Sequence, residues 1–207
     1  MNRIKLRVVA AAALVSFSGV AFAGDQGWYL FGSVGQTTDT NDKSILDDAL
    51  TSAGASGFSS SLKKPTVYGL EVGYQVDKNF AIEGGYIGSN NEDYNASGGT
   101  LAGPVSASAH VDGWDLKAVG ILPLADQFSL LGKLGVAHVH ESYNITGPGS
   151  SLSGNGSKTS ATYGIGAKYN FNNAVSVRID VDSYNVGSAA SYSRTSVWTI
   201  GLVYNFF

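Results

Sequence analysis

The chain has 207 residues, with 27 glycines, 4 prolines, no cysteine and a formal net charge of −3 at pH 7. The absence of cysteine excludes a disulfide framework and thiol chemistry, and the acidic balance argues against nucleic acid as a partner. The length favours one domain, and the many glycines together with 11% aromatic residues are typical of a β-barrel rather than of a helical membrane protein.

The first 23 residues have the pattern of a secretory signal peptide. A basic start is followed by the apolar run 8–20, and residues 21–23 form the small-x-small cleavage motif Ala-Phe-Ala. A membrane anchor is the alternative, but this run is shorter than the roughly 20 residues that a spanning helix needs. We therefore expect a signal peptide over residues 1–23 and a barrel domain over residues 24–207, located beyond the inner membrane of a Gram-negative bacterium. Without the three basic residues of the leader, the chain carries 10 Lys and Arg against 16 Asp and Glu, a formal charge of −6.

The first half of the chain contains four stretches in which apolar residues recur at every second position, as in half-buried strands. They cover residues 27–36, 66–76, 80–88 and a run that ends at Leu122. The polar segments 37–64 and 89–104 are predicted to be loops, the first with one or two helical turns around residues 44–50. The alternation breaks at Val119 and Ile121, which predicts a β-bulge near Gly120.

The second half contains four more such stretches, at residues 128–142, 161–171, 175–182 and 195–207. The segment 144–158, rich in Gly, Ser and Asn, and the shorter segment 186–193 are predicted to be loops. In the last stretch, Trp198, Ile200 and Leu202 share one face, while Thr199 and Gly201 share the other. A free edge strand of this kind invites aggregation, so we expect it to pair with the first strand and close a barrel whose apolar face meets lipid.

The eight predicted strands are joined alternately by short and long links. Short turns fall at residues 77–79, 123–127 and 172–174, and the long links are the four polar segments described above. Outer-membrane barrels have this asymmetry, with short turns in the periplasm and long loops outside, and an even strand count leaves both chain ends in the periplasm. We predict an all-β fold, an eight-stranded antiparallel up-and-down transmembrane β-barrel in the outer membrane.

Aromatic residues on the outward face are predicted to form two girdles at the membrane interfaces, because their rings combine an apolar body with a polar edge. The periplasmic girdle comprises Trp28, Tyr74, Phe80, Phe128, Tyr169, Tyr204 and Phe206, and the outer girdle comprises Tyr68, Trp114, Tyr163 and Trp198. The alternative is that aromatic residues simply favour strands. Their common face and common height in most strands argue against that alternative.

Charged residues on the inward face are predicted to meet at one level inside the barrel. They are Glu71, Glu83, Lys117, Lys133, Lys168, Arg178 and Asp180. Unpaired buried charges are costly, so we expect these groups to pair with one another. An eight-stranded barrel encloses little more than side chains, which favours an ionic plug; the alternative is a gate that rearranges to pass ions.

Stretches along most of the mature chain resemble the transmembrane domain of the outer membrane protein A family. They are G-W-Y-L-F-G-S-V-G-Q, Y-G-L-E-V-G-Y-Q, F-S-L-L-G-K-L-G-V-A, Y-G-I-G-A-K-Y-N-F, V-S-V-R-I-D and I-G-L-V-Y-N-F, and their order and spacing carry the resemblance. The resemblance implies that Glu71 pairs with Arg178. It also places Lys117 against Lys168, where that family has a Lys–Glu pair, so Glu83 or Asp180 is expected to compensate.

The resemblance also bears on the end of the chain and on partners. Many members of that family continue into a peptidoglycan-binding domain, which is not expected here because the chain stops after the last predicted strand. The terminal aromatic resembles the signal that the barrel assembly machinery reads, and both Phe206 and Phe207 are candidates for that role. The implied partners are the outer-membrane bilayer with its lipopolysaccharide and the assembly machinery, which would recognise the C-terminal strand.

Three functions are open for such a barrel. The main hypothesis is a structural protein for envelope integrity or surface display. A surface adhesin or binding module would instead use the loops 37–64, 89–104 and 144–158 to contact ligands. A porin-like pore would pass small solutes or ions through the lumen.

An enzyme is not expected, and no catalytic, cofactor or metal site is predicted. His140 and Ser142 lie on one strand face, as base and nucleophile do in barrels that deacylate lipid A, but no carboxylate follows them until Asp180. His138 shares that face, yet no carboxylate cluster joins the histidines there, so metal ligation is not supported either.

Overall fold

The structure is a computed structural model that describes residues 26–38, 42–186 and 193–206. Within these ranges it contains β1 (Gly27–Thr37), α1 (Asp42–Ser52), β2 (Ser59–Lys63), β3 (Thr66–Asp77), β4 (Phe80–Ser89), β5 (Glu92–Ser97), β6 (Val105–Pro123), β7 (Phe128–Gly147), β8 (Ser150–Asn170), β9 (Val175–Val186) and β10 (Ser193–Asn205). None of the described segments forms a helix long and apolar enough to cross a membrane. The predicted signal peptide, most of the predicted loop 186–193 and Phe207 lie outside the described residues.

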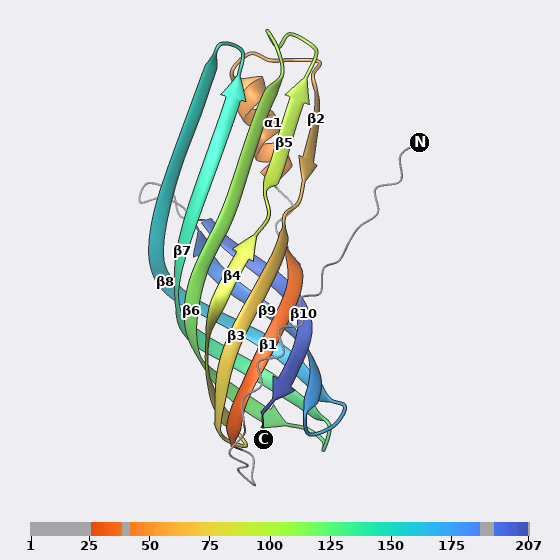
Figure 1. The fold of residues 1–207 in the computed structure, drawn as a ribbon. Helices are drawn as coiled ribbons and strands as arrows, with labels where there is room; N and C mark the ends of the chain where they lie inside the picture. The colour runs from red at the N-terminus through yellow and green to blue at the C-terminus, as the bar shows by residue number, and fades with distance from the viewer. Residues whose placement is uncertain (1–25, 39–41, 187–192, 207) are drawn as a thin grey trace.

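Eight of the strands close a barrel (Figure 1). They follow one another in the order β6-β4-β3-β1-β10-β9-β8-β7, all antiparallel, and the pairing of β6 with β7 closes the ring. The first and last strands pair directly, with Val34 opposite Ile200. The prediction of an eight-stranded antiparallel barrel closed by its first and last strands is therefore confirmed.

Side chains on the barrel wall alternate between the outside and the inside. Along β3, Leu70 and Val72 are exposed on the outside while Glu71 is buried within. Along β9, Ile179 is exposed and Arg178 is buried. A wall with apolar groups outside and charged groups inside reverses the arrangement of a water-soluble protein and fits a barrel whose outer surface meets lipid.

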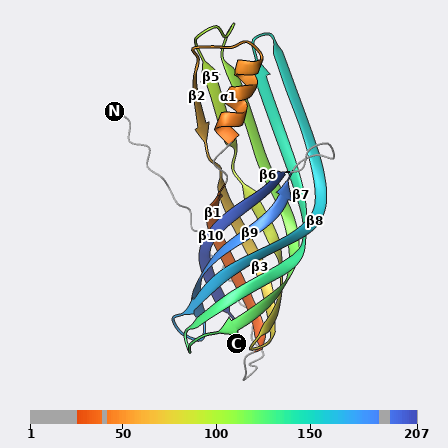
Figure 2. The ribbon, with the colours of Figure 1, turned by 180° about the vertical axis from the view of Figure 1, so that it is seen from behind.

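Three strands run on past one end of the barrel and form an extension (Figures 1 and 2). β6, β7 and β8 have 19, 20 and 21 residues, about twice the ~10 of a membrane-spanning strand. β5 pairs with this part of β6 and β2 pairs with β5, so the extension is a sheet in the order β2-β5-β6-β7-β8. α1 lies against its inner side, where Lys43 donates a hydrogen bond to Ser60 and Tyr94 donates one to Asp47.

The prediction that residues 37–64, 89–104 and 144–158 form loops is largely wrong. The first contains β2 and a helix that is longer than the predicted one or two turns, and the second contains β5. The third is a continuous hairpin of β7 and β8, with a tight turn in which Gly149 has a φ of 76°. Many residues on both faces of these strands are polar or small. A search for alternating apolar and polar residues therefore does not detect them, because that pattern requires one apolar face.

The predicted bulge near Gly120 is also wrong. β6 keeps an unbroken register with β7 from Ser106 to Pro123. Val119 and Ile121 are buried inside the barrel in an apolar layer that also contains Tyr29, Phe31, Ala81, Leu131 and Val203. At this end of the barrel, apolar residues occupy both the lipid-facing and the inward positions, and that hides the alternation from a sequence pattern.

Candidate functional site: the charged lumen

The inside of the barrel carries charged side chains from several strands. Of the seven predicted, Glu71, Glu83, Lys117, Lys133, Arg178 and Asp180 are buried, and Lys168 is half-buried. Each occupies an inward position on a strand whose outward neighbours are exposed and mostly apolar. The alternation that makes the wall therefore also brings these charges into the lumen.

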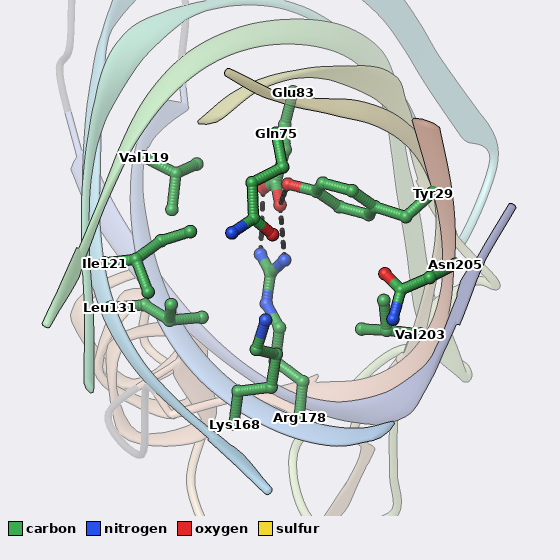
Figure 3. Close-up of a pocket in the computed structure, with 10 residues that line it drawn as sticks. All are labelled: Tyr29, Gln75, Glu83, Val119, Ile121, Leu131, Lys168, Arg178, Val203 and Asn205. Atoms are coloured by element: carbon green, nitrogen blue, oxygen red, sulfur yellow. Dashed lines mark hydrogen bonds and ion pairs between the residues drawn. The ribbon is translucent and has the colours of Figure 1, made fainter. Parts of the chain in front are cut away.

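Arg178 is the centre of one group of ion pairs (Figure 3). Its Nη2 donates to Glu83 Oε2 at 2.9 Å, its Nη1 donates to Glu83 Oε1, and its Nε lies 2.7 Å from Asp180 Oδ2. The Tyr29 hydroxyl donates to the same Glu83 carboxylate at 2.5 Å. The guanidinium also lies 4.2 Å from the ring centroid of Phe31, within the range of a cation–π contact.

Two lysines hold a second group of carboxylates. Lys117 Nζ lies 2.9 Å from Glu71 Oε1 and 3.0 Å from Asp115 Oδ2. Lys133 Nζ lies 2.8 Å from Asp180 Oδ2 and 2.8 Å from Asp182 Oδ2. Asp180 contacts both Lys133 and Arg178, and Glu71 contacts Lys117 and lies 4.0 Å from Arg178, so these ion pairs form one connected network.

Two pairings implied by the family resemblance differ in the structure. Arg178 Nη2 is 4.0 Å from Glu71 Oε2, a much looser contact than its fork on Glu83. Lys117 does not meet Lys168; it binds Glu71 and Asp115 instead. Neither Glu83 nor Asp180 forms an ion pair with Lys117 or Lys168 within the described residues; Glu83 instead takes the arginine, and Glu71 binds Lys117.

Lys168 stands apart from the other cations. In the register of β8 with β9, Lys168 lies opposite Arg178, which is also a cation. Among the described residues, no carboxylate lies within ion-pair distance of its amine. Both side chains line a small cavity together with Gln75 and Asn205, with room for about one water molecule (Figure 3).

Sequence reasoning missed four members of the network: Tyr29, Asp115, Asp182 and Tyr184. Tyr184 donates a hydrogen bond to Asp115 at 3.1 Å, and Asp182 binds Lys133. Tyr29, Asp115 and Asp182 occupy inward positions on the predicted strands, so their signal is present in the alternation, whereas Tyr184 lies two residues past the predicted strand 175–182. Asp115 and Asp182 lie farther from the short turns than the predicted level of charges, and the two tyrosines carry no formal charge that would mark them as members of an ionic network.

The lumen has more carboxylates than cations. Glu71, Glu83, Asp115, Asp180 and Asp182 face Lys117, Lys133, Lys168 and Arg178. One oxygen each of Glu71, Asp115 and Asp182 has no hydrogen-bond partner within the part of the chain that the structure describes. The arrangement can tie opposite walls together, and its carboxylates outnumber its cations by one.

The aromatic side chains predicted for the girdles lie on the outside of the barrel. Trp28, Tyr68, Tyr74, Phe80, Trp114, Tyr163, Tyr169, Trp198 and Tyr204 are exposed, and Phe128 and Phe206 are half-exposed. Neighbouring rings contact one another at the end near the chain termini, with Trp28 and Tyr74 centroids 5.1 Å apart. Tyr86, opposite Trp114 in the register, is a further exposed aromatic at the other end.

The histidines lie outside the lumen, on the outer face of β6 and β7. His140 Nε2 is 3.3 Å from Ser142 Oγ, and the register places Asp112 of β6 opposite His140. A carboxylate is thus near His140 after all, because it comes from an upstream strand rather than from the downstream sequence. Within the described ranges, no group of three or more histidines and carboxylates has the spacing of a metal site.

Comparisons with known proteins agree with this architecture. The family model described as the outer membrane protein beta-barrel domain matches residues 9–206. The fold is similar to that of Ail, the attachment invasion locus protein of Yersinia pestis, with 16% identity and a TM-score of 0.51. The match covers 89% of this chain and 100% of the Ail chain. It is also similar to the N-terminal β-barrel domain of OprF of Pseudomonas aeruginosa, with 16% identity and a TM-score of 0.52. That match covers 87% of this chain and 98% of the OprF domain. No curated protein matches the sequence.

Proposed function

Because the chain belongs to the outer membrane protein beta-barrel domain family, it is an outer-membrane barrel protein, and we propose that it serves there as a non-enzymatic structural barrel with a plugged lumen and a displayed extension. The observation that carries this proposal is the ion pair between Arg178 of β9 and Glu83 of β4. In the strand order these two strands are separated by β3, β1 and β10, so the pair crosses the interior.

Several features support a plug rather than an open channel. The connected network joins β3, β4, β6, β7 and β9 through buried groups. Next to it lies the buried apolar layer around Phe31 and Val119, which fills part of the interior between the network and the short turns. Breaking a buried ion pair leaves an uncompensated charge and is strongly unfavourable, so a network of this kind resists opening.

Conductance in planar lipid bilayers tests the plug. The refolded wild-type barrel is expected to give no stable single-channel current, whereas Arg178→Ala, which empties the centre of the lumen, is expected to leak. Lys168→Met is the matched control, because it removes a cation that takes part in none of these ion pairs, and it should stay silent. A wild-type barrel with stable open-channel currents contradicts the plug.

A cation-selective pore is the second candidate, and the excess of carboxylates in the lumen favours it over an anion pore. If the network rearranges, Glu71, Asp115 and Asp182 would face the permeating ion. Reversal potentials in a salt gradient distinguish the cases: currents that prefer K⁺ over Cl⁻ support the pore, and the preference should weaken in Asp182→Asn.

The extension is proposed to face outward from the cell and to display its surface to ligands. It continues the barrel at the end opposite the short turns, as the long loops of outer-membrane barrels do. Its sheet and α1 give it a fixed shape, which suits recognition on a rigid scaffold. Protease shaving of intact cells should cleave within residues 139–160, and a barrel shortened by this hairpin should fold but lose any surface binding. Cleavage only after the cells are opened contradicts the orientation.

We also propose that the N-terminal segment directs export of the chain and that the C-terminal strand directs its assembly into the membrane. Residues 1–23 would be removed as a signal peptide, so the mature N-terminus should be Gly24 by mass spectrometry. β10 with Phe206 or Phe207 would present the terminal signal to the barrel assembly machinery; whichever of Phe206→Ala and Phe207→Ala slows assembly in cells identifies the residue, and normal assembly of the double variant contradicts the proposal. The exposed aromatics would form the two girdles that mark the lipid interfaces, with lipopolysaccharide on the outer side.

A further inference from the structure

All three histidines of the chain lie in one patch on the outer face of the protein. In the register of β6 with β7, His138 lies opposite Trp114, His140 lies opposite Asp112, and His110 lies opposite Ser142. The exposed apolar residues Leu116, Leu134 and Val136 occupy the next rows of the same face. The histidine patch, defined by His110, His138 and His140, therefore begins where the apolar wall of the barrel ends.

The position of this patch relative to the membrane follows from the aromatic ring. Trp114 is exposed at the level proposed for the outer girdle. Same-face rows on a strand are separated by about 7 Å, and the interfacial layer is about 5–8 Å thick on each side of the hydrocarbon core. The rows of His138 and His140 thus fall within the headgroup layer of the outer leaflet, and the row of His110, about 14 Å along the strand from Trp114, lies above that layer.

Hydroxyl groups hold the imidazoles in place. His138 Nδ1 is 2.8 Å from Thr159 Oγ1, and its ring stacks on Trp114 with centroids 5.6 Å apart. His140 Nδ1 is 2.8 Å from Ser157 Oγ. Both rings thus use Nδ1 for a hydroxyl of β8. In His138 this leaves Nε2 for a ligand, whereas Nε2 of His140 also lies 3.3 Å from Ser142 Oγ, a hydroxyl that a bound phosphate would share or displace. A row of imidazole and hydroxyl groups offers the donors that a phosphate accepts.

The charge of this face depends on the histidines. Asp112 on β6 and Asp93 on β5 face the same side, and Lys63 on β2 lies opposite Asp93. β8 contributes Asn155, Ser157 and Thr159 to this face, and β4 contributes Tyr86. With neutral imidazoles the ionised groups are one cation and two carboxylates, a sum of −1; with three imidazolium groups the sum becomes +2. Imidazole changes its charge between about pH 5 and 8.

We propose that the histidine patch is a pH-gated binding site for the phosphate groups of outer-leaflet glycolipids. The patch repels phosphate when the imidazoles are neutral and binds it when they are protonated. The inference rests on the proposed outward direction of the extension, which places the patch against that leaflet. It is independent of whether the lumen is plugged.

A binding assay on the refolded protein in neutral detergent micelles tests the site. The probe is diphosphoryl lipid A dispersed in the same detergent, with phosphatidylcholine as the zwitterionic control. The affinity for the diphosphoryl lipid should rise about tenfold from pH 8.0 to pH 5.5, the factor expected for one added charged hydrogen bond. Phosphatidylcholine should show no such rise. Equal affinity for the diphosphoryl lipid at both pH values overturns the proposal.

Variants separate this site from a general effect of pH. The triple variant His110→Gln, His138→Gln, His140→Gln should bind with less than about twofold change between the two pH values. Asp112→Asn should strengthen binding at pH 8.0, because it removes the nearest carboxylate. A triple variant that keeps the tenfold rise overturns the proposal. If it does not fold, as judged by circular dichroism, His138→Gln alone serves, with the loss of pH-dependent Trp114 quenching as a second readout.

Inorganic phosphate identifies the source of the bound group. Competition by millimolar inorganic phosphate at pH 5.5 would show a site for free phosphate and overturn the assignment to lipid. Lipid binding that persists in its presence supports that assignment. Because the assay measures binding and not current, its failure does not bear on the plugged lumen, and a conducting barrel does not bear on this site.

Discussion

The stability of the barrel interior depends most on one residue, Arg178. Each of its three nitrogens donates to a carboxylate, Nη1 and Nη2 to Glu83 and Nε to Asp180, and the ring of Phe31 lies 4.2 Å from the guanidinium. All of these groups are buried, so the charges are held by one another rather than by bulk water. Such an arrangement is sensitive to the loss of a single partner, and much less so to the loss of a complete pair.

We therefore expect Arg178→Met to lower the free energy of unfolding by about 3–5 kcal/mol, because it leaves the buried Glu83 without its cation and leaves Asp180 with Lys133 alone. The double variant Glu83→Gln, Arg178→Met should be less destabilised than the sum of the two single variants, since it removes both charges of the pair. Urea unfolding in lipid vesicles, followed by tryptophan fluorescence, measures both. Additivity within about 0.5 kcal/mol would show that the two side chains are not coupled.

Lys168 and Lys133 provide a matched comparison of two lumen lysines. Lys133 is buried between Asp180 and Asp182, so Lys133→Met should lower the free energy of unfolding by about 3–5 kcal/mol. Lys168 lies beside Arg178 and takes part in none of these ion pairs, so Lys168→Met should be neutral or slightly stabilising. The same urea titration measures both variants. Equal losses would mean that Lys168 has a role in the network that its distances do not reveal.

At the scale of single elements, α1 depends on a small polar cluster for its position on the extension. Asp47 lies 2.6 Å from Lys43 and accepts a hydrogen bond from Tyr94 at 2.6 Å. Hydrogen bonds from Lys43 first, and then from Ser60 and Tyr94, lower the pKa of Asp47 to about 2. Burial and the bond to Asp47 raise the pKa of Tyr94 to about 12, so the tyrosine stays a donor over the whole physiological range.

This cluster predicts how the docking of α1 depends on pH. The folded-state pKa of Asp47 lies below its ordinary value of 3.8, so its contribution is fully present above about pH 4 and is lost as the pH falls through about 2. Hydrogen exchange of the α1 amides, after correction for intrinsic rates, should show weaker protection at pH 2 than at pH 5. Asp47→Asn should remove most of that difference. Equal protection of the wild type at both pH values would contradict the prediction.

At the scale of the whole molecule, one chain builds two surfaces for two solvents. The barrel wall exposes aliphatic side chains in a closed band, while the extension above it is mostly polar. Leu134 on the wall is 66% exposed, and Leu152 on the extension is 60% exposed. The two leucines are equally accessible, but we expect the first to contact lipid and the second to contact water.

A pair of arginine substitutions locates the membrane boundary. Leu134→Arg should cost about 2–4 kcal/mol in the free energy of unfolding from a bilayer, because it places a charge near the midplane. Leu152→Arg should change it by less than about 0.5 kcal/mol, as an exposed surface substitution does. Unfolding in vesicles measures both. Similar costs at the two positions would place the extension in the bilayer and contradict the proposed topology.

The sequence by itself determined the barrel. Period-two alternation at residues 66–76 and 175–182 predicts both the strands and the face on which Glu71 and Arg178 lie, because side-chain direction in a strand is a local property. The alternate short and long links then give the eight-strand topology, and the apolar last strand predicts closure against the first. These inferences need no knowledge of distant contacts.

The tertiary structure decided what the local pattern does not contain. The partner of each lumen charge depends on the stagger of strands far apart in the chain, so Arg178 binds Glu83 rather than Glu71. The strands β2 and β5 are only 5 and 6 residues long, too short for alternation to reveal them, and they are formed by pairing with a neighbour in the extension. The approach of Asp112 to His140 likewise arises from register. Alternation is encoded residue by residue, whereas pairing across a barrel is fixed only when the ring closes.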